Sequence, residues 1–135
     1  IKTARALLKK SRIDPPDPSA SIEFKCAYME KTGLESGSAE LVLLSQSLHH
    51  VATPPTVIKE AYRLLCDGGK LLILDLASHQ KDWMRNKFGD FWLGFSQENI
   101  RQWLLQCGFK NISIQISADA QTKEDINTLI ISAIK

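Results

Sequence analysis

The stretch ELVLLSQSLHHVATPPTVIKEAYRLLCDGGKLLILDL, residues 40–76, decides the fold. It opens with the apolar block Leu41–Leu44, in which polar and apolar residues do not alternate. Such a block is typical of a strand that is buried on both faces. A helix is predicted to follow from Thr53, which can cap it, because Pro54 and Pro55 suit a first turn. The apolar residues then recur at helical spacing, at Val57, Ile58, Ala61, Leu64 and Leu65.

Four further segments complete the first half of the chain. Asp67-Gly68-Gly69 is predicted to end the helix and to turn into Lys70–Leu76, a second strand buried on both faces. Upstream, residues 22–27 are predicted as a short strand, and residues 1–12 as a helix with an apolar face and a basic face. Strand, helix and strand in this order predict an α/β protein with a parallel sheet.

The second half predicts one more helix and a pair of strands. The helix starts at Ser96 and stops at Gly108. Alternating isoleucines then predict an edge strand around Ile114, and Thr128–Ile134, rich in branched residues, predicts a closing strand. The link between these two strands, residues 118–125, is short and polar. It cannot hold a crossover helix, so the two strands should form an antiparallel hairpin.

Composition indicates one globular domain, with 44% hydrophobic and 24% charged residues among 135. No apolar run approaches the ~20 residues of a membrane helix. Five cations in the first twelve residues are interpreted as a solvated helix face rather than a nucleic-acid site, because no aromatic residues interleave with them. Cys26, Cys66 and Cys107 lie far apart, which favours buried, reduced thiols in a cytoplasmic protein over disulfides or zinc. No metal cluster is evident from spacing.

The stretch from Glu40 to Gly69, together with DLASHQKDWMRNKFGDFWLGFSQENIRQWLLQCGF at residues 75–109, resembles class I S-adenosylmethionine-dependent methyltransferases. The match is to the bacterial branch that is often fused to ArsR-type winged-helix regulators. The resemblance implies a Rossmann-like sheet with strand order 3-2-1-4-5-7-6 and a cofactor at the carboxyl ends of the first strands. On this pattern the chain is a partial sheet of strands three to seven, without strands one and two. Strand seven should then lie between strands five and six.

The resemblance also implies how a single partial methyltransferase domain, residues 1–135, is divided. Residues 1–12 correspond to the helix after strand two, and residues 22–76 hold strands three to five. Residues 77–95 form a lid on the acceptor side, and residues 96–135 form the last helix and the hairpin. The glycine-rich loop after strand one and the acidic residue ending strand two are the family's main cofactor contacts, and neither is present.

Candidate site residues follow from the same resemblance. Ala27, Tyr28 and Met29 take the position of the adenine-binding loop, where Tyr28 can stack on the base or simply pack in the loop. Ser45, Gln46 and His50 stand where strand four passes the methionine end of the cofactor. His49 and His50 are the catalytic candidates, although methyl transfer needs a base only for some acceptors. The lid candidates, which pack over the acceptor or in the core, are His79, Trp83 and Trp92.

The expected function is methyl transfer from S-adenosylmethionine to a small-molecule acceptor by the parent protein. Two alternatives stay open: a non-catalytic remnant, and a cofactor sensor attached to a winged-helix regulator. The chain alone is expected to bind the cofactor weakly or not at all. Because the predicted strand Leu41–Leu44 would lie at an open sheet edge, a homodimer is also expected.

Overall fold

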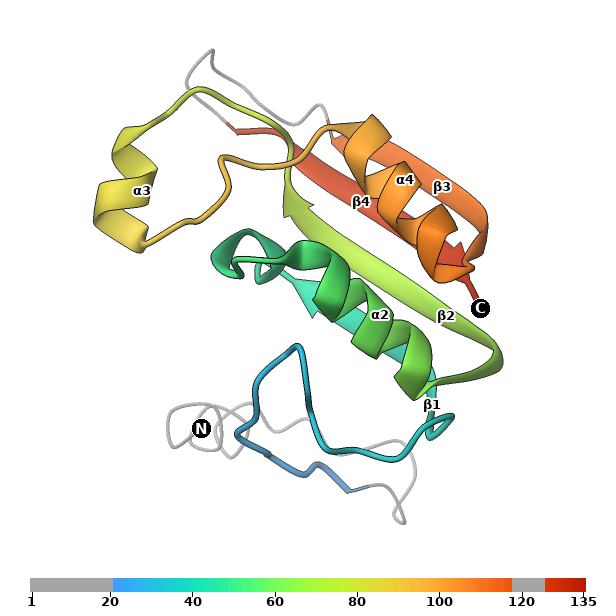
Figure 1. Ribbon diagram of the computed structural model, residues 1–135. Helices are drawn as coiled ribbons and strands as arrows, with labels where there is room; N and C mark the ends of the chain where they lie inside the picture. Colours follow the sequence, from blue (N-terminus) through green and yellow to red (C-terminus); the bar gives the residue numbers. More distant parts are fainter. Residues whose placement is uncertain (1–20, 118–125) are drawn as a thin grey trace.

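The computed structural model describes residues 21–117 and 126–135 (Figure 1). The predicted helix over residues 1–12 and the link 118–125 lie outside the described residues. No helix in the described part of the chain is long and apolar enough to cross a membrane. The elements are, in order, β1 (Ala39–Ser45), the 3-10 helix η1 (Leu48–His50), α2 (Pro54–Leu64), β2 (Leu65–Leu76), α3 (Trp83–Phe88), α4 (Gln97–Cys107), β3 (Lys110–Ser117) and β4 (Thr128–Ile134).

The described strands form one sheet in the order β1-β2-β4-β3. β1 runs parallel to β2, with Leu43 opposite Leu72. β4 is antiparallel to both β2 and β3, and it lies between them. This arrangement confirms the α/β class, the partial Rossmann-like sheet and the antiparallel hairpin, including the insertion of the last strand.

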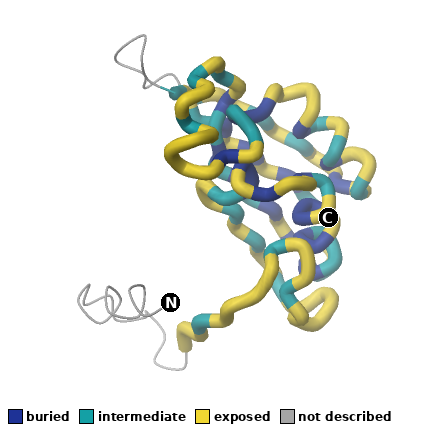
Figure 2. Tube along the Cα trace, turned by 60° about the vertical axis from the view of Figure 1, so that its left-hand side comes forward, coloured by how far each residue is buried: buried dark blue, intermediate teal, exposed yellow. Residues whose placement is uncertain are grey.

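The core lies on one face of the sheet, beneath α2 and α4 (Figure 1). Figure 2 shows the buried residues inside the described part of the chain, with exposed residues around them. Burying each large aliphatic side chain contributes about 1.5–3 kcal/mol, so this layer is the main source of stability. The residues that make it are Val57, Ile58 and Ala61 from α2, Ile100 and Leu104 from α4, Leu71 and Ile73 from β2, and Leu129, Ile131 and Ala133 from β4.

The opposite face of the sheet corrects the prediction that β1 is buried on both faces. Leu41 is 58% exposed and Leu43 is 54% exposed. The described helices α2 and α4 both pack on the other face, so these two side chains have no helix over them among the described residues. Within that part of the chain β1 pairs with β2 alone, so it is an edge strand. The homodimer through this edge stays a prediction.

The short strand predicted over residues 22–27 is wrong. Residues 21–27 carry no strand, and the chain makes only an isolated bridge between Tyr28 and Lys31 just after them. A strand requires a neighbour for its backbone groups, and the described sheet offers this segment none. The prediction that the cysteines are buried is also wrong, because Cys26 is exposed and Cys66 and Cys107 are only half-buried, although all three thiols are free.

The helix ends were predicted with mixed success. Ser96 caps α4, because its Oγ accepts from the Asn99 amide, and Gly108 ends that helix in the left-handed conformation. Thr53 precedes α2 as predicted, but its side chain makes no capping hydrogen bond. Helix α2 stops at Leu64, before the predicted glycine turn, and Gly68 lies inside an irregular stretch of β2 with φ 78°.

A buried carboxylate ties the loop before β1 to α2. Glu60 accepts hydrogen bonds from the amide and the hydroxyl of Thr32, at 2.9 and 2.7 Å. It also accepts from Arg63, whose Nε lies 2.8 Å from Oε2. The Arg63 hydrogen bond, aided by Thr32 and opposed by burial, lowers the pKa of Glu60 from 4.5 to about 2.

We expect Glu60→Gln to lower the free energy of unfolding at neutral pH by about 1–3 kcal/mol, since it weakens charged hydrogen bonds. Because the folded-state pKa of Glu60 is depressed, its contribution is complete above the ordinary value of 4.5 and is lost as the pH falls through about 2. In urea unfolding, the difference in the free energy of unfolding between wild type and variant should therefore shrink as the pH falls between these two values. Glu23→Gln, at an exposed position, is the control. A gap that stays constant down to acid pH contradicts the assignment.

Candidate functional site

The site lies at the carboxyl ends of β1 and β2, where two connections meet. After β1 the chain turns sharply at Gln46, a non-glycine residue with φ 48° whose amide donates to the Leu74 carbonyl at 2.7 Å. Left-handed backbone at a residue other than glycine is uncommon and often marks a functional turn. The turn leads into η1, where Leu48 is fully buried and fixes the two histidines that follow.

The second connection, residues 77–95, leaves β2, forms α3 and returns to its own base. The Phe95 amide donates to the Leu76 carbonyl at 2.9 Å, and the Ser78 amide donates to the Phe95 carbonyl at 3.1 Å. Gly94 makes this closure possible with φ 73°, because a Cβ there would lie 2.2 Å from the Ala77 carbonyl oxygen. The returning limb is thereby held against the end of β2.

A buried histidine–carboxylate pair stands at the centre of the site. Nδ1 of His49 lies 2.6 Å from Oδ1 of Asp75, and the side chains are 7% and 0% exposed. The backbone amides of Leu48 and Leu76 donate to the two oxygens of Asp75 at 2.9 and 2.8 Å. With three donors around it, the Asp75 carboxylate is fixed in place, and it keeps the proton of a neutral His49 on Nδ1.

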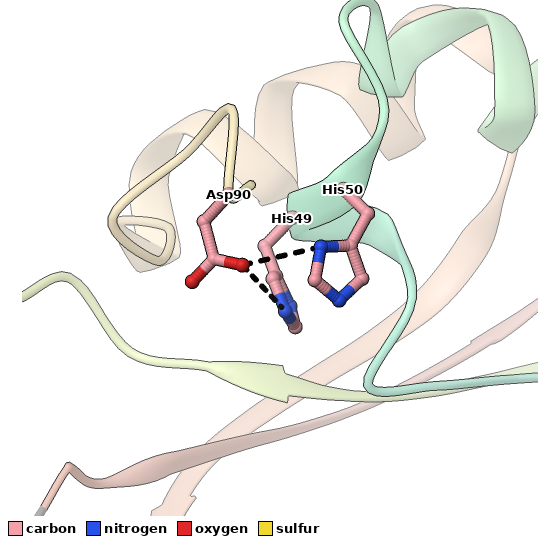
Figure 3. Close-up of side chains that lie close together, drawn as sticks. All are labelled: His49, His50 and Asp90. Carbon is pink, nitrogen blue, oxygen red and sulfur yellow. Dashed lines mark ion pairs between the residues drawn. The ribbon is translucent and has the colours of Figure 1, made fainter. Parts of the chain in front are cut away.

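Asp90 reaches the same place from the returning limb of residues 77–95 (Figure 3). The amides of Phe91 and Trp92 both donate to the His49 carbonyl, at 3.0 and 3.1 Å, so the backbone beside Asp90 is joined to η1. Oδ1 of Asp90 lies 3.2 Å from Nδ1 of His50 and 3.7 Å from Nε2 of His49. The carboxylate is 1% exposed, and neither oxygen has a hydrogen-bond partner in the described residues.

These side chains border a pocket of about 280 Å³. Its wall combines polar atoms with apolar surface from Leu76, Met84 and Phe88. Ligand sites of open α/β sheets lie outside the carboxyl ends of the strands, which is where this pocket is found. The lining residues are Gln46, His49, His50, Leu76, Met84, Phe88 and Asp90.

The predicted lid residues divide into packing residues and an exposed one. Trp92 donates from Nε1 to the Val51 carbonyl at 3.1 Å and stacks edge-on with Trp103, whereas Trp83 is 52% exposed on α3. His79 accepts from the Lys81 amide through Nδ1, and its Nε2 is buried without a hydrogen-bond partner in the described residues. Burial, aided by Lys81 and His49 and opposed by Asp90, lowers the pKa of His79.

The predicted cofactor residues fall into two groups. Gln46 and His50 line the pocket, beside the catalytic candidate His49. Ser45 ends β1 as an exposed residue and does not line this pocket. In the loop before β1, Ala27 and Tyr28 are exposed, with Tyr28 at 81%, and Met29 packs against the core. Their roles in binding the cofactor stay predictions.

Two acidic residues of the site had no role assigned from the sequence. Asp75 lies near the end of the predicted strand Lys70–Leu76, and an acid at the end of an apolar run is a signal that could have singled it out. Asp90 lies 40 positions beyond His50 and follows Gly89 in a segment without helical or strand periodicity. Its closeness to the histidines depends on how residues 77–95 return, which no spacing rule supplies.

Comparison with known proteins agrees with this geometry. A family model described as a methyltransferase domain matches residues 1–73. The ubiquinone biosynthesis O-methyltransferase of Xanthomonas oryzae pv. oryzae is 31% identical over 77 residues, which cover 56% of this chain and 32% of that protein. The chain spans between 3% and 32% of the length of the curated relatives that it matches.

Solved structures share the fold at low sequence identity. The CurJ carbon methyltransferase is 16% identical and superposes with a TM-score of 0.75 over 98% of this chain and 38% of that one. A SAM-dependent methyltransferase from Methanosarcina mazei is 18% identical, with a TM-score of 0.70 over 99% of this chain and 77% of that one. Because the family model covers more than half of the sequence, the chain belongs to the methyltransferase domain family, and its sheet shares the fold of these solved methyltransferase structures.

Proposed function

We propose that this chain forms the acceptor side of an enzyme that transfers a methyl group from S-adenosylmethionine to a small molecule. The observation that carries the proposal is the pair of His49 and Asp75, joined at 2.6 Å at the carboxyl ends of β1 and β2. A neutral imidazole held this way presents Nε2 as a proton acceptor to the pocket. Family membership supplies the reaction class, and the pair favours one kind of acceptor.

That acceptor is a molecule that must lose a proton when it is methylated, such as a hydroxyl group or an acidic C–H. The bound cofactor supplies a methyl group on a positively charged sulfur. Nε2 of His49 would take the proton that the acceptor loses as it gains this methyl group from the sulfur. Asp75 stabilises the resulting imidazolium and stays ionised. The carbon and oxygen methyltransferases among the similar proteins are named for acceptors of these two kinds.

For the cofactor itself, the described residues fit only one part. The crevice beside Gln46 and His50 suits the methyl-donating end, and we propose that Ala27, Tyr28, Met29 and Ser45 contribute nearer the adenosine. No two glycines of the sequence are separated by a single residue, so the chain has no glycine-rich dinucleotide-type loop. We therefore propose that this loop and the acid that binds the ribose come from residues of the natural protein outside this chain.

Isothermal titration with S-adenosylhomocysteine tests the proposal on two proteins. For the 135-residue chain alone we expect a dissociation constant weaker than about 1 mM, because most directed contacts to the cofactor are missing. The complete product of the natural gene should bind at about micromolar concentration. Failure of the complete product to bind would overturn the proposed function. Low-micromolar binding by the chain alone would refute the division of the cofactor site.

A further inference from the structure

We infer that His49, His50 and Asp90 form a binding site for a divalent transition-metal ion of the zinc type. The three donor atoms are Nε2 of His49, Nδ1 of His50 and Oδ1 of Asp90 (Figure 3). Two imidazoles and one carboxylate are a ligand set that zinc and its neighbours in the first transition row prefer. The site lies in the pocket wall, so open coordination positions face solvent or a small ligand.

The distances between donors suit a single ion. With metal–ligand bonds of about 2.0–2.2 Å, donors in a tetrahedron stand about 3.3–3.6 Å apart. In the structure Oδ1 of Asp90 lies 3.2 Å from Nδ1 of His50 and 3.7 Å from Nε2 of His49. These two separations require shifts of only a few tenths of an ångström, and the ligand atoms of all three residues lie within 4.8 Å of one another.

The state of Asp90 is the second observation that points to a cation. Its side chain is 99% buried, and neither oxygen receives a hydrogen bond from the described residues. Burial of a carboxylate without a partner costs several kcal/mol, so such groups are usually paired or coordinate metals. The contact with His50 is within ion-pair distance but lacks hydrogen-bond geometry. An ion between the three donors would accept a lone pair from Oδ1 of Asp90 and one from each of the two histidine nitrogens.

Asp75 contacts the other ring nitrogen of His49, the one that does not face the proposed ion. A histidine that binds a metal ion commonly donates its other N–H to a carboxylate, which fixes the tautomer and turns the free nitrogen toward the metal. His49 has this partner, with Nδ1 lying 2.6 Å from Asp75. Its Nε2 is then left without a proton on the side where Asp90 lies, and two facing lone pairs repel unless a proton, a water molecule or a metal ion lies between them.

Metal binding is a property separate from the proposed methyl transfer. An ion bound to Nε2 of His49 would occupy the atom that accepts the proton, so metal binding and proton transfer through His49 exclude each other. Metal affinity is measured without cofactor or acceptor, so its result is independent of whether the enzyme proposal holds.

Titration of the 135-residue chain with Zn²⁺ against a chromophoric chelator is the test, with Co²⁺ as a spectroscopic substitute. We expect a Zn²⁺ dissociation constant of about 10 µM or tighter. Asp90→Asn should weaken it about 100-fold or more, because one ligand is lost while the shape is kept. His50→Gln, at a side chain that is 44% exposed and tolerant of change, should do the same and separates ligand loss from misfolding.

Two matched controls address the other metal-binding side chains. His79→Gln removes the third histidine of the sequence, and Cys26→Ser removes the exposed thiol. Both should keep the affinity for Zn²⁺ within about threefold, because neither residue belongs to the ligand set. Binding of Zn²⁺ by Asp90→Asn as tightly as by the wild type would overturn the inference, as would the absence of micromolar binding by the wild type.

Discussion

Gly94→Ala should lower the free energy of unfolding by about 2–4 kcal/mol, a large fraction of the stability of a chain this size. Two costs combine. The backbone of Gly94 has φ 73°, where an L-residue is strained by about 1 kcal/mol or more. The added Cβ would also lie 2.2 Å from the Ala77 carbonyl oxygen, which is backbone and cannot swing aside. To relieve this clash, the two ends of residues 77–95, which are joined by the hydrogen bonds of Phe95 with Leu76 and Ser78, would have to separate.

Gly89→Ala is the matched control for this substitution. Gly89 has nearly the same backbone, φ 72°, but a Cβ there meets nothing within 4 Å. It should therefore cost only the conformational strain, about 1 kcal/mol. Thermal and urea unfolding of both variants measure the difference. Equal losses of stability for the two variants would mean that the close approach of Gly94 to Ala77 does not stabilise residues 77–95.

The elements of the sheet could be predicted because their signals are local. Apolar runs predicted β1 and β2, alternating isoleucines predicted β3, and Ser96 and Gly108 predicted the ends of α4. The start of β2 was predicted too late, because the strand begins at Leu65 and not at Lys70. The length and polarity of the last link were enough to predict an antiparallel hairpin. The strand predicted over residues 22–27 failed because β-propensity without a neighbouring strand does not make a strand.

Only part of the candidate site could be predicted from the sequence. His49 and His50 are adjacent and follow a strand, so their place at the carboxyl end was predictable. Asp90 was not, because it is brought to them by long-range contacts: the closure at Gly94 and the amides of Phe91 and Trp92 on the His49 carbonyl. Such contacts depend on the tertiary path of a loop, which has no periodicity to read.

Asp75→Asn should lower the turnover rate of the complete natural enzyme by about 10²–10⁴-fold, with the KM for the acceptor nearly unchanged. With its oxygen in the place of Oδ2, asparagine still accepts from the Leu48 amide, and its NH₂ group then donates to Nδ1 of His49 while the hydrogen bond from the Leu76 amide is lost. The proton of the imidazole moves to Nε2, and the proton acceptor is lost. A merely structural role for Asp75 would instead change stability and KM together.

Methyl-labelled S-adenosylmethionine, with the acceptor that incorporates the label, measures these rates. Asp82→Asn is the matched control, because Asp82 is an exposed carboxylate in the same connection and its side chain does not cap α3. It should leave the rate within about twofold of wild type, as surface substitutions commonly do. If Asp75→Asn has a rate close to that of Asp82→Asn, His49 does not accept the proton in this reaction.

Both the proton transfer and the metal site require that Asp75 keeps the proton of His49 on Nδ1 and leaves Nε2 unprotonated toward the pocket. Long-range ¹⁵N–¹H correlation spectra of the 135-residue chain at mildly alkaline pH, where imidazoles are ordinarily neutral, report this tautomer directly. We expect a protonated Nδ1 and an unprotonated Nε2 for His49, and the reverse in Asp75→Asn. A wild-type spectrum with the proton of His49 on Nε2 would rule out this role of Asp75.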